Sequence, residues 1–110
     1  NVLVKEVLKM DLSEMQKKVY QNKLNKGFNV TDVPKEFCYL YGEVAEAYDA
    51  YLKGKEDLGE ELADVAIYLL GLSEILGYDL KEQVEYKMAK NEKRIYKEVN
   101  GAHIKIEGDK

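Results

Sequence analysis

The pattern of apolar and polar positions along the chain predicts four helices joined by short links. Apolar residues recur every three or four positions, as they do on one face of an α-helix, and the predicted helices cover residues 12–26, 33–53, 56–76 and 80–99. Residues 1–10 form a lead-in that the pattern does not assign to helix or loop, and residues 101–110 form a short polar tail in which 103–106 could be a strand. The predicted fold class is therefore all-α, a four-helix bundle-like domain.

Capping and stop signals support these helix ends. Ser13 and Gln16 have the spacing of a capping box at the first helix, and Thr31 or Asp32 can cap the second helix, which has Pro34 in its first turn. A glycine follows each of the first three helices, at Gly27, Gly54 and Gly77.

The first two helices have apolar faces that predict a core. In the first helix Leu12, Met15 and Val19 point inward, with Gln16 and Lys23 on the border of that face. The main apolar face of the second helix comprises Phe37, Leu40, Tyr41, Val44, Tyr48, Tyr51 and Leu52. Its opposite side combines Tyr39, Ala47 and Ala50 with Glu36, Glu43, Glu46 and Asp49, a combination that predicts a walled acidic groove.

The third helix is apolar almost all round and still carries acidic side chains. One stripe consists of Leu58, Leu62, Val65, Leu69, Leu72 and Leu76. Glu61 falls within this stripe and Asp64 lies at its edge, so neither is expected on a solvated face. Such carboxylates are normally protonated, paired or bound to a cation, and residues 56–80 contain no Lys or Arg. An apolar helix of this kind also suggests that a second chain covers part of it.

Two acidic pairs are the candidate chemical site. Glu43 and Glu46 are three residues apart on the second helix, and Glu61 and Asp64 are three apart on the third. This spacing puts both members of a pair on one helix face, so two antiparallel helices would offer four carboxylates to one cavity. Oxygen ligands of this kind suit Mg²⁺ or Mn²⁺. A buried, hydrogen-bonded structural role fits the same spacing equally well, because the sequence has many other acidic pairs at this distance.

Three polar residues on the fourth helix form a second candidate group. Lys87, Asn91 and Arg94 are spaced i, i+4 and i+7 along the edge of its apolar stripe. Two cations and an amide on one line can bind the oxygens of a polyphosphate. For the helix taken alone, rim residues paired with nearby acids are the commoner explanation. An acidic metal site and a basic rim together favour a phosphate ester as the ligand.

Composition narrows the class of protein. The 110 residues are 45% hydrophobic with a single Pro, which predicts one globular domain over residues 1–110. The net charge of −4 argues against a nucleic-acid polymer or an anionic membrane as partner. No apolar run is long enough to span a bilayer, and no signal peptide is seen. Cys38 is the single cysteine, expected to be packed rather than nucleophilic, and it favours a reducing cytoplasm.

The ordered set of motifs resembles a known family. Glu43-x-x-Glu46, then Glu61-x-x-Asp64, then Lys87-x-x-x-Asn91-x-x-Arg94 is similar to the MazG-like superfamily of all-α nucleoside triphosphate pyrophosphohydrolases. That superfamily also contains dimeric dUTPases, dCTP pyrophosphatases and phosphoribosyl-ATP pyrophosphohydrolases. The similarity extends over residues 11–99 and is strongest around Glu60-Glu61-Leu62-Ala63-Asp64-Val65.

The resemblance implies an activity and a set of site residues. The activity is Mg²⁺-dependent cleavage of a nucleoside triphosphate to the monophosphate and pyrophosphate. The four carboxylates of the acidic pairs would be metal ligands and catalytic residues, while Lys87, Asn91 and Arg94 would contact the phosphates. Because relatives place base contacts on the first helix, Gln16 and Tyr20 are the implied base-binding residues. The resemblance also implies that the second chain covering the third helix is a second copy, in a homodimer or homotetramer.

The sequence also departs from the family and leaves alternatives open. Gly42 stands where many relatives have a further Glu, and Trp is absent, so any base stacking must come from Tyr20, Phe28, Tyr39 or Tyr68. One alternative is a non-catalytic dimeric helical interaction module whose buried acids pair with Lys87 and Arg94. A second, a di-iron bundle, would need Glu-x-x-His ligands, and the single histidine, His103, lies outside the predicted helices.

Overall fold

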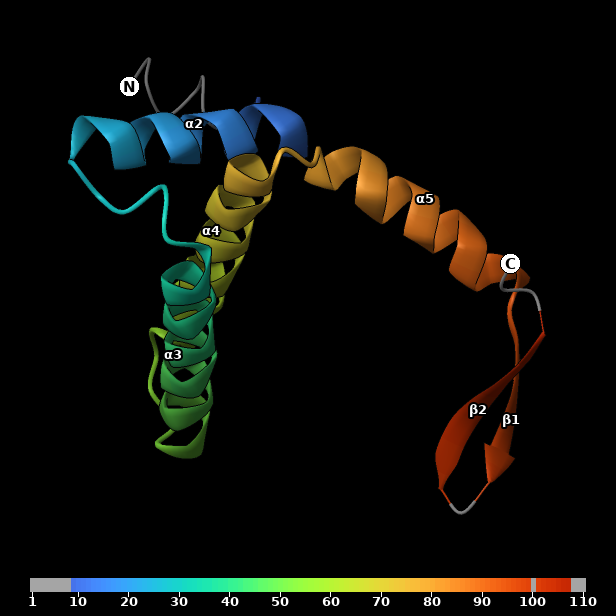
Figure 1. Ribbon diagram of the computed structural model, residues 1–110. Coiled ribbons are helices and arrows are strands. Elements are labelled where there is room, and N and C mark those ends of the chain that lie inside the picture. The colour runs from blue at the N-terminus through green and yellow to red at the C-terminus, as the bar shows by residue number, and fades with distance from the viewer. Residues whose placement is uncertain (1–8, 100, 108–110) are drawn as a thin grey trace. The chain divides into compact units, whose positions relative to one another are not determined.

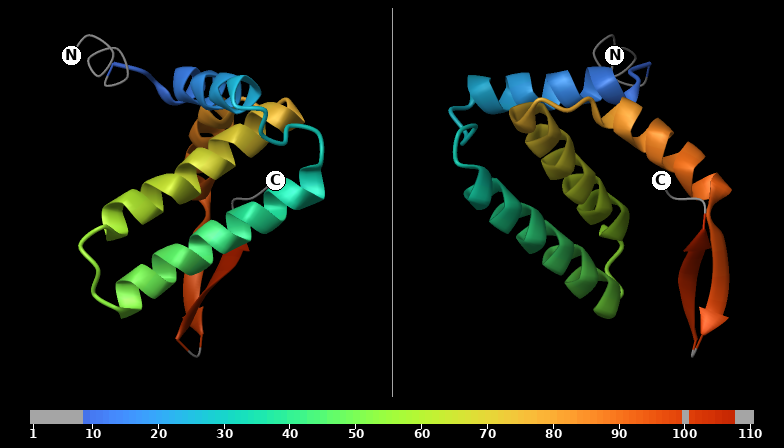
Figure 2. Two further views of the ribbon diagram at one scale, coloured as in Figure 1. Left: turned by 90° about the vertical axis from the view of Figure 1, so that its left-hand side faces the viewer. Right: turned by 45° about the vertical axis from the view of Figure 1, so that its right-hand side comes forward.

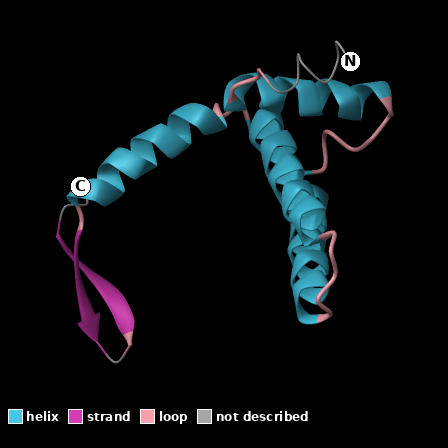
Figure 3. Ribbon diagram, turned by 180° about the vertical axis from the view of Figure 1, so that it is seen from behind, coloured by secondary structure: helices cyan, strands magenta, loops and turns pink. Residues whose placement is uncertain are grey.

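The computed structural model describes residues 9–99 and 101–107 as helices followed by a β-hairpin. The helices are α2 (Leu12–Asn25), α3 (Val33–Leu52), α4 (Leu58–Leu76) and α5 (Leu80–Lys93), and the strands are β1 (Ile95–Val99) and β2 (Ala102–Glu107). Figure 3 distinguishes the helices from the hairpin by colour. The predicted all-α, bundle-like fold is confirmed for the helical part. The predicted lead-in falls largely on residues 1–8, outside the described residues.

The chain divides into two compact units, residues 1–80 and 81–110. In the first unit α3 and α4 run antiparallel beside each other, and α2 packs against α4 across one end of the pair (Figures 1 and 2). The second unit holds nearly all of α5 together with the hairpin. None of the helices in the described residues is long and apolar enough to cross a membrane.

Local signals set the helix ends of the first unit. The Asp11 carboxylate accepts a hydrogen bond from the Glu14 backbone N–H at 2.9 Å and caps α2, in place of the predicted Ser13. The Asp32 carboxylate does the same for α3 at the Lys35 N–H, at 3.1 Å. At the end of α4 the backbone turns at Gly77 with φ +80°, a conformation that glycine adopts without steric cost.

The last predicted helix is too long. The sequence predicted a helix over 80–99, but α5 ends at Lys93 and residues 95–99 form β1. This strand pairs antiparallel with β2, with Val99 opposite Ala102 and a register shift between Ile95 and Tyr96. The physical reason lies in the side chains of 95–99, since Ile, Tyr and Val are better suited to strands than to helices.

The buried core within the described residues is small and contains few large apolar side chains. Apolar residues buried among those described are Ala47, Ala50, Leu70 and Leu72. The predicted apolar face of α3 is instead largely exposed, and so are Leu62, Leu69 and Leu76 of the α4 stripe. Cys38, expected to be packed, is exposed as well. The reason is that α3 turns its acidic side toward α4 rather than its aromatic side.

Candidate metal and substrate site

The candidate site is built on one seam, where a face of α3 meets a face of α4. On α3 the seam carries Glu36, Tyr39, Glu43 and Glu46, spaced i, i+3, i+7 and i+10. On α4 it carries Glu61, Asp64, Tyr68 and Gly71 at the same spacing. Because the helices are antiparallel, Glu43, Glu46, Glu61 and Asp64 gather at one end of the seam, the tyrosines meet in its middle, and Glu36 lies toward the other end.

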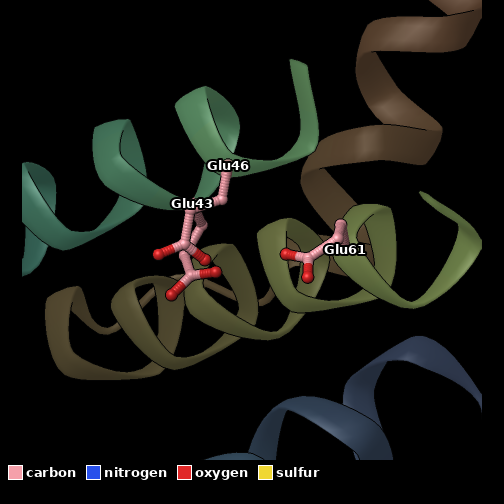
Figure 4. Close-up of side chains that lie close together, drawn as sticks. All are labelled: Glu43, Glu46 and Glu61. Atoms are coloured by element: carbon pink, nitrogen blue, oxygen red, sulfur yellow. The ribbon is translucent and has the colours of Figure 1, made fainter. Parts of the chain in front are cut away.

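Three of the four predicted metal ligands come together at the acidic end. Carboxylate oxygens of Glu43, Glu46 and Glu61 lie within 4.8 Å of one another, close enough to share one cation. Figure 4 shows Glu43 and Glu46 projecting from α3 toward α4, from which Glu61 projects. Glu43 and Glu61 are half-buried and Glu46 is exposed. We call these three residues the acidic cluster.

Burial and mutual repulsion dominate the electrostatics of the acidic cluster. One oxygen of Glu43 and one of Glu61 are buried without a hydrogen-bond partner among the described residues. Burial raises the pKa of Glu43, and the charges of Glu46 and Asp64 raise it further. Burial and the charges of Asp57 and Glu46 likewise raise the pKa of Glu61. A bound cation would satisfy the orphaned oxygens and reverse these shifts.

Asp64 and Lys55 border the cluster. Asp64 follows Glu61 by one turn on α4 and is exposed, although the sequence predicted a less solvated position; its charge raises the pKa of Glu43. A cavity of about 360 Å³ opens beside Glu46 and Glu61 and is also lined by Asp49 and Lys55. The Lys55 ammonium lowers the pKa of Glu61, opposing the other effects. The site thus has acids to hold a cation and a lysine beside them.

Comparison with known proteins agrees with this geometry. The family model of the MazG-like family matches residues 36–108, more than half of the chain and all of the acidic cluster. The chain belongs to the MazG-like family. This membership suggests a function of the nucleotide pyrophosphohydrolase type, in a family that typically depends on divalent metals. No curated protein and no solved structure matches the chain.

Beyond the acidic cluster of this MazG-like chain, the seam continues through a tyrosine pair to a buried ion pair. The rings of Tyr39 and Tyr68 meet edge to face, with centroids 6.2 Å apart. Next to them the Lys23 ammonium of α2 donates to Glu36, and both residues are buried. The Asn29 amide donates to the second Glu36 oxygen at 3.0 Å. Lys23 therefore ties α2 to α3 through a charge pair that is fully hydrogen-bonded at Glu36.

The two residues that the resemblance implies for base binding have different surroundings. The Gln16 side chain is buried; its amide NH₂ donates to Glu74 and to the Tyr78 carbonyl, and its oxygen accepts from the Leu80 N–H at 2.9 Å. These hydrogen bonds fix α2 to the end of α4 and use the donor and acceptor groups of the Gln16 amide. Gln16 is therefore not part of the site proposed below. Tyr20 is half-buried on α2.

The predicted phosphate-binding residues belong to the second unit. Lys87 and Asn91 are exposed on α5. Arg94, predicted to lie within the helix, directly follows its last residue, and its backbone N–H donates to the Asn91 carbonyl at 3.2 Å. Their role toward phosphate stays a prediction.

Sequence reasoning missed the buried pair Lys23–Glu36 and the position of Lys55. Lys23 was placed on the border of a helix face and Glu36 in an acidic row, and both patterns are compatible with solvent exposure. A signal was present, since Lys23 lies at the border of an apolar helix face and could pair with a buried acid. Only the packing of α2 and α3 on the same helix, α4, brings Lys23 and Glu36 together.

Proposed function

We propose that this MazG-like protein is a metal-dependent nucleoside triphosphate pyrophosphohydrolase, which converts the triphosphate to the monophosphate and pyrophosphate. The observation that carries the proposal is the acidic cluster, in which two buried carboxylate oxygens have no hydrogen-bond partner within the described part of the chain. A purely structural role would leave these oxygens without a partner, which is unfavourable for polar atoms removed from water. A cation-binding role explains them, and membership of the family supports it.

Glu43, Glu46, Glu61 and Asp64 would hold Mg²⁺ or Mn²⁺. Their donors are all carboxylate oxygens, the ligand type that these ions prefer. When bound, the ion supplies neutralisation of the polyphosphate charge and polarisation of the phosphoryl oxygens.

We assign the proton transfer to Glu43. A water oxygen attacks the α-phosphorus, the bond from that phosphorus to the bridging oxygen breaks, and pyrophosphate leaves with the bonding pair. The water proton passes to the Glu43 carboxylate. The Glu43 carboxylate is half-buried within the acidic cluster, so it would lie beside a water held at the cation.

Cationic side chains are proposed to bind the phosphates. Lys55 lies beside Glu46 and Glu61 in the same cavity, within the first unit. From the second unit we propose Lys87, Asn91 and Arg94, as the family resemblance implies. Cations placed around transferring and leaving phosphate groups stabilise the charge that develops there.

We further propose that the protein assembles as a homo-oligomer, either a dimer or a tetramer, through the aromatic face of α3. Its exposed members are Phe37, Tyr41, Val44, Tyr48, Tyr51 and Leu52, each between 38% and 67% exposed. An apolar strip of this length is rare on a monomer, and the four buried apolar residues make a small core for one copy. A second copy would bury the strip and enlarge the core.

The decisive experiment measures pyrophosphate release from a panel of ribo- and deoxyribonucleoside triphosphates with Mg²⁺ or Mn²⁺. The native chain is compared with Glu61→Gln and Asp64→Asn, and Glu60→Gln serves as the exposed control on the same helix. We expect metal-dependent turnover that is lost in both site variants and kept in the control. Absence of turnover with every triphosphate, together with metal-independent stability, would instead identify a non-catalytic helical interaction module.

A further inference from the structure

A cavity of about 320 Å³ lies on the side of the seam that faces α2. Its apolar lining comes from three segments: Val19 on α2, Phe28 in the α2–α3 link, and Ile67 and Tyr68 on α4. A second cavity, of about 200 Å³, shares Phe28 and Tyr68 with it and extends to Tyr39. Phe28 is 54% exposed, and the Lys26 ammonium lies 6.0 Å from its ring centroid. We call the first cavity the α2–α4 pocket.

The polar lining of the α2–α4 pocket is rich in hydrogen-bond donors. It comprises Lys18, Asn22 and Lys23. Lys23 is 8% exposed, and its ammonium carries three N–H donors and no acceptor. Its hydrogen bond to Glu36 uses one donor, and the ammonium also lies over the Tyr68 ring, 5.4 Å from the centroid. A buried cation with unused donors favours a ligand that presents an acceptor atom.

The pocket lies within reach of the acidic cluster. Tyr68, which lines it, follows Asp64 by four residues and Glu61 by seven on one helix face. At 1.5 Å per residue these separations are about 6 and 10 Å. The phosphates and the base of a nucleotide lie on opposite sides of one sugar ring. With the phosphates at the cluster, the sugar would lie over the Tyr39–Tyr68 pair and the base would enter the pocket.

We infer that the α2–α4 pocket binds the base of the substrate and that Lys23 selects bases with a keto group at the edge farthest from the sugar. This inference rests on the proposed function. Uracil and thymine at position 4, and guanine and hypoxanthine at position 6, present an oxygen acceptor there, whereas cytosine and adenine present an amino donor. An amino group in this place would set a donor against the Lys23 ammonium, which has no acceptor to offer it.

The closing experiment separates base recognition from catalysis. Amide shifts of the ¹⁵N-labelled protein are titrated, in EDTA, with two matched pairs of monophosphates, UMP against CMP and IMP against AMP. Each pair differs chiefly in a keto or an amino group at one position. We expect UMP and IMP to shift amides of residues 18–23, 28 and 67–68 and to bind about tenfold more tightly than CMP and AMP. Equal affinities within each pair, or shifts confined to other residues, would overturn the inference.

Variants test the role of Lys23 directly. Because Lys23→Met leaves Glu36 buried without its cation, the double variant Lys23→Met/Glu36→Met replaces the whole pair by apolar side chains, which buried pairs often tolerate. We expect it to bind all four monophosphates with one affinity, while the surface variant Lys53→Met keeps the keto preference. A preference that survives in the double variant would show that Lys23 does not select the base.

Failure of this inference is distinguishable from failure of the proposed function. If triphosphates are hydrolysed with metal but the monophosphates show no keto preference, the pocket assignment is wrong and the acidic cluster stands. If UMP and IMP bind in the pocket with the expected preference but no triphosphate is hydrolysed, the hydrolase proposal is wrong and the pocket is a nucleotide-binding site.

Discussion

Replacing Glu43 by Gln is expected to stabilise the metal-free protein at neutral pH, although it removes a residue of the proposed site. The oxygens of Glu43 and Glu46 lie within 4.8 Å. Two unit charges at that separation repel by about 0.9 kcal/mol in bulk water and about 3.5 kcal/mol at an effective dielectric constant of 20. Because Glu46 is exposed, the lower value applies, and relief of about 1 kcal/mol would raise the Tm by roughly 4 °C or more.

The pH dependence has a definite sign. The pKa of Glu43 is raised in the folded protein by burial and by the charges of Glu46 and Asp64, whereas in the unfolded chain it is about 4.3. At a pH between the unfolded and the folded pKa, Glu43 keeps its proton in the folded protein and loses it in the unfolded chain. The free energy of unfolding therefore falls as pH rises through this window. Glu43→Gln has no carboxylate to ionise and keeps its stability as the pH rises. The variant is therefore expected to be more stable than the native chain at pH 7 and equally stable at pH 3.

The assay is thermal unfolding by circular dichroism at low ionic strength, at pH 3 and pH 7, in EDTA and with added Mg²⁺. Metal at 100 times its Kd stabilises a folded protein by about 2.7 kcal/mol, an effect expected for the native chain and lost in Glu43→Gln. Glu60→Gln, an exposed change on α4, is expected to leave both behaviours unchanged. A Tm at pH 7 in EDTA that falls in Glu43→Gln, or an undiminished response of that variant to Mg²⁺, would refute the reasoning.

Three further changes test other parts of the molecule. Phe28→Ala should weaken nucleotide binding about 5- to 100-fold by loss of stacking, measured by titration, while stabilisation by Mg²⁺ stays native; an unchanged affinity would remove Phe28 from the base site. Lys55→Met should raise KM for the triphosphate several-fold at an unchanged response to metal, and Lys53→Met, whose partner Asp49 is exposed, should leave KM as it is. Tyr48→Ser on the aromatic face of α3 should shift the mass measured by light scattering toward that of one copy, and a mass independent of this change would exclude that face as the interface.

Helix ends in the first unit follow signals that act within a few residues, which is why the sequence predicted them well. Asp32 and Pro34 begin α3 where expected, because a capping carboxylate and a proline in the first turn act through the backbone beside them. Gly77 ends α4 for the same local reason. The acidic cluster could also be predicted from the sequence, since i, i+3 spacing fixes a helix face without knowledge of the fold.

The end of α5 was predicted wrongly because a helical pattern was extended through a strand signal. Ile95 and Val99 fit the apolar period of a helix, but β-branched residues before Asn100-Gly101 favour a hairpin, for which an Asn-Gly dipeptide is a strong sequence signal. Asn100-Gly101 also suits a helix stop, so periodicity alone did not separate the two. The pairing of Val99 with Ala102 decides for the hairpin.

The exposure of the aromatic face of α3 is the difference from expectation with the widest consequences, and its cause bears on function. Hydrophobicity alone would bury Tyr41 and Tyr48, yet the structure buries Ala47 and Ala50 and exposes the two tyrosines. Small side chains let the helices approach, so that Glu43 and Glu61 are held close enough to share a cation. A protein that maximised the stability of one copy would bury the aromatic face. The arrangement observed instead places repelling carboxylates at the seam and leaves apolar surface outside, so the proposed cation and the proposed second copy would each add stability that one metal-free copy lacks.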